Sequence, residues 1–430
     1  MAVDKNLFLY NVSIVSIMKN EGPYAKEWLD YHLLAGVEHF YIYDNDSPDN
    51  LKEVLQPYID AGIVTYTFFP GEVMQCAAYN DALKKYRFLS RYIAFIDGDE
   101  FIFPQENKTI PEVLEDIFSQ FPNGSGLAIN WHLYGSNFQE KADYSKGVLE
   151  RFTRRCEKHY GNPLNNQGLD HGNAYTKTVT NPRAVDFFPD PHYPNYYAGL
   201  YRINEEGKPA NTLSINYPIT DKKICINHYF LKSREEYEKK IPRGDAYYSK
   251  NPRKKESFSH DNSNEEFDDE ILKYRAFRLS MGGGMIQPVN YQKCYNALLQ
   301  NLSPTFSKYV PLENFAGKME TFLTCRKLAE VLREIILTEE VGKFFEETAL
   351  IAIHKTLSTN VTLADLRLLI SELPNILQLD YPVVTEIRRT CINVIPQMMH
   401  LFRINNIWRE FTELEYLMNM LKLFDKNNPA

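Results

Sequence analysis

Three acidic residues follow an apolar run near the end of the first hundred residues. The run over 92–96 leads into Asp97, Gly98, Asp99 and Glu100. Asp97 and Asp99 are two positions apart, so their carboxylates can project to the same side, and Gly98 eases the turn between them. Paired carboxylates are hard oxygen ligands that suit Mg²⁺ or Mn²⁺, ions that complete their shells with water and substrate phosphates. The pattern predicts a site that neutralises a diphosphate leaving group. A solvated turn after a core strand is the structural alternative.

The first 135 residues alternate between patterns that indicate strands and helices. Apolar or β-branched runs predict strands over 12–18, 39–43, 63–69, 92–96 and 127–131, and helical spacing predicts helices over 24–35, 51–59, 75–88 and 111–121. Such alternation is typical of βαβ units and a mainly parallel sheet, in which ligands bind beyond the carboxyl ends of the strands. We therefore expect an α/β fold with Asp97 and Asp99 at the rim of a ligand crevice.

Beyond residue 135 the periodicity weakens. Residues 136–290 are rich in Asn, Tyr, Pro and basic side chains, and we interpret them as the remainder of the first domain plus long functional loops. A run of three glycines at 282–284 interrupts the pattern, and amphipathic helical spacing follows. We therefore expect a first domain over 1–290 and an all-α C-terminal domain over 310–430.

The composition is that of a folded protein. A length of 430 residues suggests about two or three domains, and 44% hydrophobic with 24% charged residues excludes disorder and collagen-like structure. A net charge of -8 argues against binding to bulk nucleic acid. Six scattered cysteines without a CxxC pair are typical of a reduced, intracellular setting. The apolar run over 12–18 is too short to span a bilayer, so we expect a cytoplasmic protein.

Several ordered motifs accompany the acid pair. They are SIMKNE at 16–21, EWLDYH at 27–32, GVEHFYIYDNDS at 36–47, QCAAYN at 75–80 and DGDEF at 97–101, followed by weaker likenesses in WHLYGS at 131–136, YTKTV at 175–179 and NHYF at 227–230. Together they resemble the nucleotide-sugar domain of glycosyltransferases of the GT-A fold, above all glycosyltransferase family 92 and its bacterial family-2-like relatives. The resemblance covers about 1–245 and implies a Rossmann-like domain with a mainly parallel mixed sheet.

The resemblance implies that turns after the strands bind the nucleotide-sugar donor. The donor-binding set would consist of Lys19, Asn20, Glu21, Asp44, Asp46, Gln75, Asn80, Asp97 and Gly98. Residues 19–21 would line the nucleotide pocket, and Asp44 or Asp46 would reach the ribose or base. Gln75 and Asn80, on one side of a helix, would contact the nucleotide. The alternatives are a helix N-cap turn for the two aspartates and exposed polar positions for the two helix residues.

The resemblance also implies a metal site formed by Asp97, Asp99 and His228, with Mn²⁺ or Mg²⁺ as the cofactor. Such enzymes often take a third protein ligand from late in the domain, and imidazole is acceptable to Mn²⁺ and less so to Mg²⁺. A hydrogen-bonded core histidine is the alternative for His228. His171 and His192 are looser candidates for a ligand.

Trp131 and His132 are candidates for the acceptor site, because an aromatic ring can stack on a sugar face. An aromatic residue after a central strand also fits a core position. Lys177 could meet phosphate or an acidic acceptor, or belong to a solvated face. Lys240 and Arg243 fall in a basic segment similar to one of the family, and the sequence assigns them no role.

An inverting transfer needs a carboxylate that takes the proton of the acceptor hydroxyl while its oxygen attacks the anomeric carbon. The acids in the expected window include Glu150, Asp186 and Asp190. Asp190 is favoured because its loop over 188–192 is aromatic and rigidified by proline, and Glu150 is the second catalytic candidate. A retaining mechanism would not need this base, and the sequence does not exclude it.

Two other classes of protein fit part of the pattern. Phosphatases of the haloacid dehalogenase type also end a strand in D-x-D, but Thr or Val commonly follows there, whereas Glu100 and Phe101 follow here. A non-catalytic carbohydrate- or partner-binding protein could use the same fold, although the intact acids argue against it. Dinucleotide oxidoreductases and P-loop enzymes are excluded because their glycine motifs are absent.

The sequence therefore predicts a metal-dependent glycosyltransferase. It would move a sugar from a nucleotide-diphospho donor, a UDP-sugar above all, to a glycan or glycolipid acceptor with inversion. We expect it in the cytoplasm, at the inner face of a bacterial membrane where surface polysaccharide is built. The helical C-terminal region could join two copies into a homo-oligomer, dock the enzyme peripherally at the membrane or bind a partner.

Overall fold

A computed structural model describes residues 8, 10–87, 89–122, 124–158, 160, 172–196, 200–210, 214–249 and 254–284 of the chain. All of these except residue 8 belong to a compact unit formed by Tyr10–Tyr196 and Leu200–Pro288. The helical domain predicted over 310–430 lies outside the described residues, and the boundary of the first domain stays a prediction. None of the helices in the described ranges has the length and apolar character that a membrane span requires.

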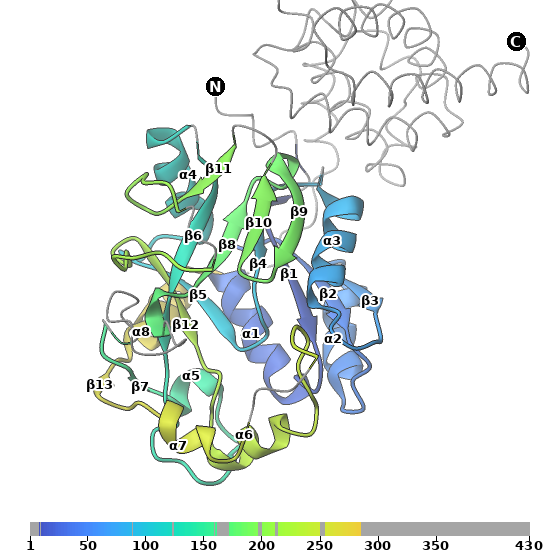
Figure 1. Cartoon of the computed structure of the whole chain (residues 1–430), viewed down its shortest axis with the longest axis vertical. Helices are drawn as coiled ribbons and strands as arrows, with labels where there is room; N and C mark the ends of the chain where they lie inside the picture. The colour runs from blue at the N-terminus through green and yellow to red at the C-terminus, as the bar shows by residue number, and fades with distance from the viewer. Residues whose placement is uncertain are drawn as a thin grey trace, which may run out of the picture. The chain divides into compact units, whose positions relative to one another are not determined.

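Strands and helices alternate along the first 135 residues of the unit, as the sequence predicts, and shorter elements follow (Figure 1). The helices are α1 Gly22–Leu34, α2 Leu51–Asp60, α3 Gln75–Tyr86, α4 Ile110–Gln120, α5 Val148–Arg151, α6 Arg234–Lys240, α7 Ser257–Asp261 and α8 Glu270–Ser280. The strands are β1 Tyr10–Met18, β2 His39–Asp44, β3 Val64–Phe68, β4 Ser90–Phe95, β5 Glu100–Pro104, β6 Gly124–Leu133, β7 Arg154–Arg155, β8 Thr176–Thr180, β9 Val185–Asp190, β10 Tyr193–Tyr196, β11 Tyr201–Ile203, β12 Ile224–His228 and β13 Glu266–Phe267.

Most of the strands form one large mixed sheet (Figure 1). Its order is β3-β2-β1-β4-β8-β6-β12-β5, and β11 pairs with β6. The strands β3, β2, β1 and β4 run parallel to one another, and β12 is parallel to β6. In contrast, β8 is antiparallel to both β4 and β6, and β5 is antiparallel to β12. The predicted α/β class with a mainly parallel mixed sheet is therefore confirmed.

The two faces of the sheet pack into separate cores, because consecutive strand residues project to opposite sides. On one face, Val12 and Ile14 of β1 belong to a core shared with α1, α2, α4 and α8. On the other face, Val15 and Ile17 belong to a core with Tyr79 of α3. Both faces are thus covered, and the turns after the parallel strands lie at the edge between them.

The middle of the chain, predicted as the rest of the first domain with long loops, contributes three strands to the large sheet, β8, β11 and β12. All five residues of β8 are buried, yet four of them are Thr or Lys and only Val179 is apolar, so the strand shows no apolar pattern. Their polar groups are satisfied locally: the hydroxyls of Thr178 and Thr180 donate to the carbonyls of His192 and Ser125. A central strand built from paired polar residues escapes a prediction based on hydrophobic periodicity.

Candidate active site

A cleft of about 540 Å³ opens at the carboxyl ends of β1, β2 and β4. Lys19, Asn45 and Asp97 line it from the turns after these three strands, because the parallel register brings the strand ends side by side. The segment 242–249 lines it as well. The volume falls in the range of roughly 300–1,000 Å³ that small-molecule sites occupy.

Asp97 is held by side chains from α3 and β8. Gln75 Nε2 donates to Asp97 Oδ1 at 2.5 Å, and the hydroxyl of Tyr79 donates to the same oxygen at 3.4 Å. Lys177 Nζ lies 3.0 Å from Asp97 Oδ2 and 3.9 Å from Glu100 Oε2. The Asp97 side chain is still 33% exposed, so its fixed carboxylate remains open to a ligand.

Asp99 has different partners because β5 pairs with β12. That antiparallel register places His228 opposite Glu100, the residue after Asp99. His228 Nε2 lies 3.4 Å from Asp99 Oδ1. Lys240 Nζ, at the end of α6, donates to Asp99 Oδ2 and to the carbonyl of Phe230, both at 2.6 Å. The two carboxylates of the acid pair therefore face separate lysines.

Burial and ion pairing set the charges at this rim. Burial alone would raise the pKa of Asp99, but Lys240 and His228 hold it well below its usual value. Burial lowers the pKa of Lys240 to about 7, against the attraction of Asp99. Glu100 is fully buried, and burial raises its pKa well above the usual range. The ionised form is thus favoured at Asp99 and disfavoured at Glu100.

A second group of charges ties the turn after β1 to the segment 242–249. Arg243 Nη1 donates to Glu21 Oε1 at 2.5 Å and to the carbonyl of Lys19 at 2.7 Å. Lys232, whose side chain is 1% exposed, has its Nζ 4.0 Å from Glu21 Oε2. The cations in the cleft lining are Lys19, Lys177, Lys240 and Arg243. This set suits a phosphorylated ligand.

Aromatic rings form another part of the cleft. The ring of Trp131 lies 4.4 Å from that of His228 and 5.2 Å from that of His192, measured between centroids. His192 Nδ1 lies 3.0 Å from the carbonyl of Thr176, and burial together with Lys177 lowers the pKa of His192 to about 4. His192 is therefore neutral near pH 7, with Nδ1–H donating to the carbonyl and Nε2 left as an acceptor.

Asp190 lies beside the cleft and contacts a residue of its lining. The hydroxyl of Tyr247, which lines the cleft, donates to Asp190 Oδ2 at 3.0 Å. The hydroxyl of Ser214 lies 3.4 Å from Asp190 Oδ1. The next residues along the chain, Pro191 and His192, both line the cleft.

Most of the residues predicted from the motifs come together in this cleft. Its lining includes Lys19, Glu21, Gln75, Asp97, Gly98, Asp99, Trp131 and His228. They belong to the turns after β1 and β4, the start of α3 and the ends of β6 and β12. The structure thus gathers predicted donor, metal and acceptor residues at one place, while their roles stay predictions.

Asp44, the last residue of β2, and Asp46 in the turn after it do not line the cleft. Asp44 is buried, and its carboxylate accepts hydrogen bonds from the hydroxyl of Tyr66 at 2.8 Å and from the main-chain N–H of Ser47 at 2.9 Å. Asp46 is exposed in the turn at a φ of 58°. Asn45, between them, is the residue that reaches the cleft. Asp44 therefore shapes the turn, but it does not cap the next helix: the N-cap of α2 is Asn50, which makes no side-chain cap hydrogen bond.

Two further residues of the predicted donor set also lie outside the cleft lining. The main-chain N–H of Asn20 donates to the hydroxyl of Ser47 at 3.1 Å, which joins the turns after β1 and β2. The side chain of Asn80 exchanges hydrogen bonds with the main-chain N–H and carbonyl of Phe188 at 2.7 and 3.0 Å. The Asn80 side chain is therefore placed to fix the backbone beside the cleft, whereas Asn20 does so through its main chain.

The alternative catalytic acids do not reach the cleft either. Glu150 is 48% exposed and pairs with Arg275 at 3.0 Å. Asp186, on β9, is exposed, and the cleft lining does not include it. His171 lies outside the described residues.

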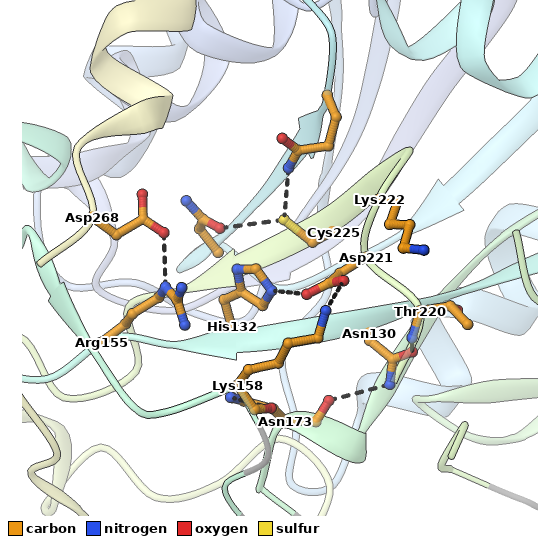
Figure 2. Close-up of polar contacts among 12 residues, drawn as sticks. Asn130, His132, Arg155, Lys158, Asn173, Thr220, Asp221, Lys222, Cys225 and Asp268 are labelled. Carbon is orange, nitrogen blue, oxygen red and sulfur yellow. Dashed lines mark hydrogen bonds and ion pairs between the residues drawn. The ribbon is translucent and has the colours of Figure 1, made fainter. Parts of the chain in front are cut away.

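His132 projects away from the cleft although its neighbour Trp131 lines it, because consecutive strand residues alternate between faces. Figure 2 shows His132 beside Asp221 and Lys158: His132 Nε2 lies 3.0 Å from Asp221 Oδ2, and Lys158 Nζ lies 2.5 Å from Asp221 Oδ1. Against the effect of burial, Cys225 and Asp221 raise the pKa of His132 to about 10. The structure therefore gives His132 no place in the predicted acceptor site.

Some residues of the cleft lining have no role in the sequence prediction. They are Asn45, Lys240, Arg243 and Tyr247, among others. The basic segment that holds Lys240 and Arg243 is similar to a segment of the family, and this similarity is the signal by which the sequence could have pointed to these two residues. Tyr247 carries no motif, and it reaches the cleft because the chain after α6 folds back over the turn after β1.

The acid pair and His228 do not form a closed metal site. Within the described ranges, no three His, Cys, Asp or Glu side chains gather closely enough to hold an ion. Asp99 Oδ1 and His228 Nε2, 3.4 Å apart, nevertheless fit two adjacent positions on an octahedral ion, where ligands lie about 3 Å apart at bonds of ~2.1 Å. Asp97 is turned toward Gln75 and Lys177 instead. The residues fit an ion that takes its other ligands from a phosphorylated substrate and water.

Known proteins match the chain over this region. The model of glycosyltransferase family 92 matches residues 21–272. A glycosyltransferase family 92 protein of Ricinus communis is 28% identical over 147 residues, which cover 34% of this chain and 26% of that protein. A galactan beta-1,4-galactosyltransferase of Arabidopsis thaliana is 33% identical over 164 residues, which cover 33% of this chain and 31% of that protein. The chain spans about a quarter to a third of these curated relatives.

Solved structures show a weaker likeness. Residues 1–349 of S. aureus TarS, crystallised in complex with UDP, are 14% identical with a TM-score of 0.30, and the match covers 77% of this chain and 82% of that one.

Proposed function

The chain belongs to glycosyltransferase family 92, and on that premise we propose that its cleft binds a nucleotide-diphospho sugar and transfers the sugar to a glycan or glycolipid. The observation that carries the proposal is the pairing of each rim acid with a lysine, Asp97 with Lys177 and Asp99 with Lys240. These pairs lie beyond the carboxyl ends of parallel strands, where α/β proteins bind nucleotides. The lysines match a diphosphate, and the acids match hydroxyls and a metal ion.

A divalent cation is the cofactor that we propose, Mn²⁺ before Mg²⁺ because one ligand is an imidazole. Asp99 Oδ1 and His228 Nε2 would hold it. When bound, the ion would neutralise the charge on the departing nucleoside diphosphate. Asp97 would serve the donor in another way: its partly exposed carboxylate, fixed by Gln75 and Lys177, can accept hydrogen bonds from donor hydroxyls.

Asp190 is the general base in this proposal. Hydrogen bonds from Tyr247 and Ser214 fix its carboxylate next to the cleft. From there it would take the proton of the acceptor hydroxyl while that oxygen bonds to the anomeric carbon and the bond from this carbon to the diphosphate breaks. The ring of Trp131 would offer a flat surface for a sugar.

A UDP-sugar is the donor that we propose, with UDP-galactose first in the screen. Two Arabidopsis thaliana relatives, 34% and 33% identical, are named galactan beta-1,4-galactosyltransferases. Their matches cover 22% and 31% of those proteins, so UDP-glucose and UDP-N-acetylglucosamine belong in the same screen.

Release of UDP from these donors tests the proposal. The full chain is incubated with each UDP-sugar, Mn²⁺ and a panel of β-linked oligosaccharides, and UDP is quantified. We expect Mn²⁺-dependent release that Asp99→Asn abolishes. Lys239→Met, at a side chain 57% exposed on α6, is the matched control and should retain it. Lack of release from every donor by the folded chain would contradict the proposed function.

A further inference from the structure

Lys240 occupies a fixed position at Asp99. Its side chain is 7% exposed, and its Nζ donates to Asp99 Oδ2 and to the carbonyl of Phe230. The helix that carries it, α6, begins at a capping box formed by Ser233 and Glu236. Arg151 Nη2 lies 2.6 Å from Glu236 Oε1 in a buried ion pair. The position of Lys240 at Asp99 is therefore set by the fold and not by a flexible surface chain.

The two carboxylate oxygens of Asp99 have different partners. Oδ2 is taken by the ammonium of Lys240, while Oδ1 points to His228 Nε2. A divalent ion at Oδ1 would share this carboxylate with a cation, and like charges a few ångströms apart in a partly buried site repel each other strongly. Arg243 and Lys232, both near Glu21, add positive charge to the same wall.

We propose that Lys240 makes uptake of the divalent ion depend on the nucleotide donor. This inference rests on the proposed function, because it requires the cleft to take a nucleoside diphosphate. In the free protein, Lys240 neutralises Asp99, and the ion finds only two protein ligands and a repelling ammonium. A diphosphate in the cleft supplies further oxygen ligands for the ion, and its negative charge attracts the ammonium of Lys240. The ion and the nucleotide therefore bind cooperatively, and Lys240 acts as the positioning residue that couples them.

The test measures binding without any turnover. The full chain is titrated calorimetrically with Mn²⁺ alone, with UDP alone, and with Mn²⁺ in saturating UDP. We expect UDP to tighten Mn²⁺ binding by at least about tenfold, and by linkage Mn²⁺ to tighten UDP binding by the same factor. In Lys240→Met, which keeps the length but not the charge, Mn²⁺ alone should bind about tenfold more tightly than in the wild type, and the coupling should shrink.

Two further variants separate charge from structure. Lys240→Arg keeps the cation and should keep the coupling. Lys239→Met removes a neighbouring exposed cation of the same helix, so its coupling should equal that of the wild type. Circular dichroism confirms that each variant is folded, and the wild-type titrations test the coupling without any variant.

Specific outcomes would overturn the inference. If Mn²⁺ binds the wild type equally well with and without UDP, the proposed coupling does not exist. If the coupling is unchanged in a folded Lys240→Met protein, Lys240 does not cause it. Both outcomes leave UDP binding intact and so spare the proposed nucleotide site, although the first would contradict the proposed role of the ion at the diphosphate. Absence of UDP binding under every condition is a different result, which counts against the proposed function and therefore against the inference built on it.

Discussion

Lys177 Nζ lies 3.0 Å from Asp97 Oδ2, although β8 and the turn after β4 are far apart in the sequence. The lysine side chain is 1% exposed, and it also faces the buried carboxyl of Glu100 at 3.9 Å. Because β8 is antiparallel to β4, it brings Lys177 directly to the acid pair. Asp97 and Glu100 raise the pKa of Lys177 above its usual value against the effect of burial. The same cation therefore serves both the stability of the sheet and the charge of the cleft.

Replacing Lys177 by Met should destabilise the fold. The change leaves the carboxylate of Asp97 without its buried cation, and removing one partner of a buried ion pair costs about 3–5 kcal/mol. Because Asp97 is 33% exposed, we expect a loss at the lower end of this range. Urea unfolding followed by circular dichroism measures this loss. Lys208→Met, at a side chain 72% exposed, is the control and should stay within about 0.5 kcal/mol of the wild type. Equal stability of the two variants would show that the Lys177 ion pair contributes little.

The two aspartates of the acid pair should respond differently to substitution. Asp99→Asn removes the carboxylate that faces His228, so we expect the affinity for UDP to lose its dependence on Mn²⁺. Asp97→Asn changes the group held by Gln75 and Lys177, so we expect UDP to bind about tenfold more weakly with or without Mn²⁺, in line with the loss of a charged hydrogen bond. Calorimetric titration with UDP distinguishes them, and identical behaviour of the two variants would refute the division of roles.

Asp190→Asn should slow sugar transfer without weakening donor binding. A general base contributes roughly 10²- to 10⁴-fold to a rate, whereas Asp190 lies outside the cleft lining that would hold the nucleotide. Tyr247→Phe removes one hydrogen bond to this carboxylate and should have a smaller effect. Transfer rates and UDP affinities measured side by side provide the check. A larger loss of rate in Glu150→Gln than in Asp190→Asn would assign the base to the other acid.

The pair formed by His132 and Asp221 should make stability fall at alkaline pH. The pKa of His132 is raised from 6.5 to about 10, so the pair stabilises fully below pH 6.5 and loses its effect as pH rises through about 10. The pKa of Asp221 is lowered from 3.8 to about 2, so its contribution to stability is complete above pH 3.8 and is lost as the pH falls through about 2. We therefore expect Asp221→Asn to lower the urea midpoint more at pH 6 than at pH 10. A larger effect at pH 10 would contradict this sign.

The first part of the fold could be predicted from the sequence because its signals are local. The apolar run over 12–18 lies within β1, and the helical spacing over 111–121 matches α4, which opens with a capping box of Thr109 and Glu112. The cleft-lining turns followed from the same argument, since residues after parallel strands, such as Lys19 and Asp97, meet at one edge of the sheet.

The rest of the site depends on contacts that no local pattern records. Lys240 and Asp99 are 141 positions apart, and their ion pair exists because β12 and α6 return the chain to the acid pair. The strand that carries Lys177 is built from polar residues, so periodicity does not reveal it. The side to which His132 projects depends on the register of β6. Trp131 and His132 are neighbours in the sequence, and the sequence does not show which of the two faces the cleft.

Calorimetric titration of the full chain with UDP, in the presence and absence of Mn²⁺, tests the central claim most directly. We predict binding that Mn²⁺ strengthens, and we predict that Asp99→Ala abolishes this strengthening. Silence of the folded chain toward UDP, GDP and CDP with Mn²⁺ present would contradict a nucleotide-sugar site, and a non-catalytic binding protein on the same fold would then be the better account.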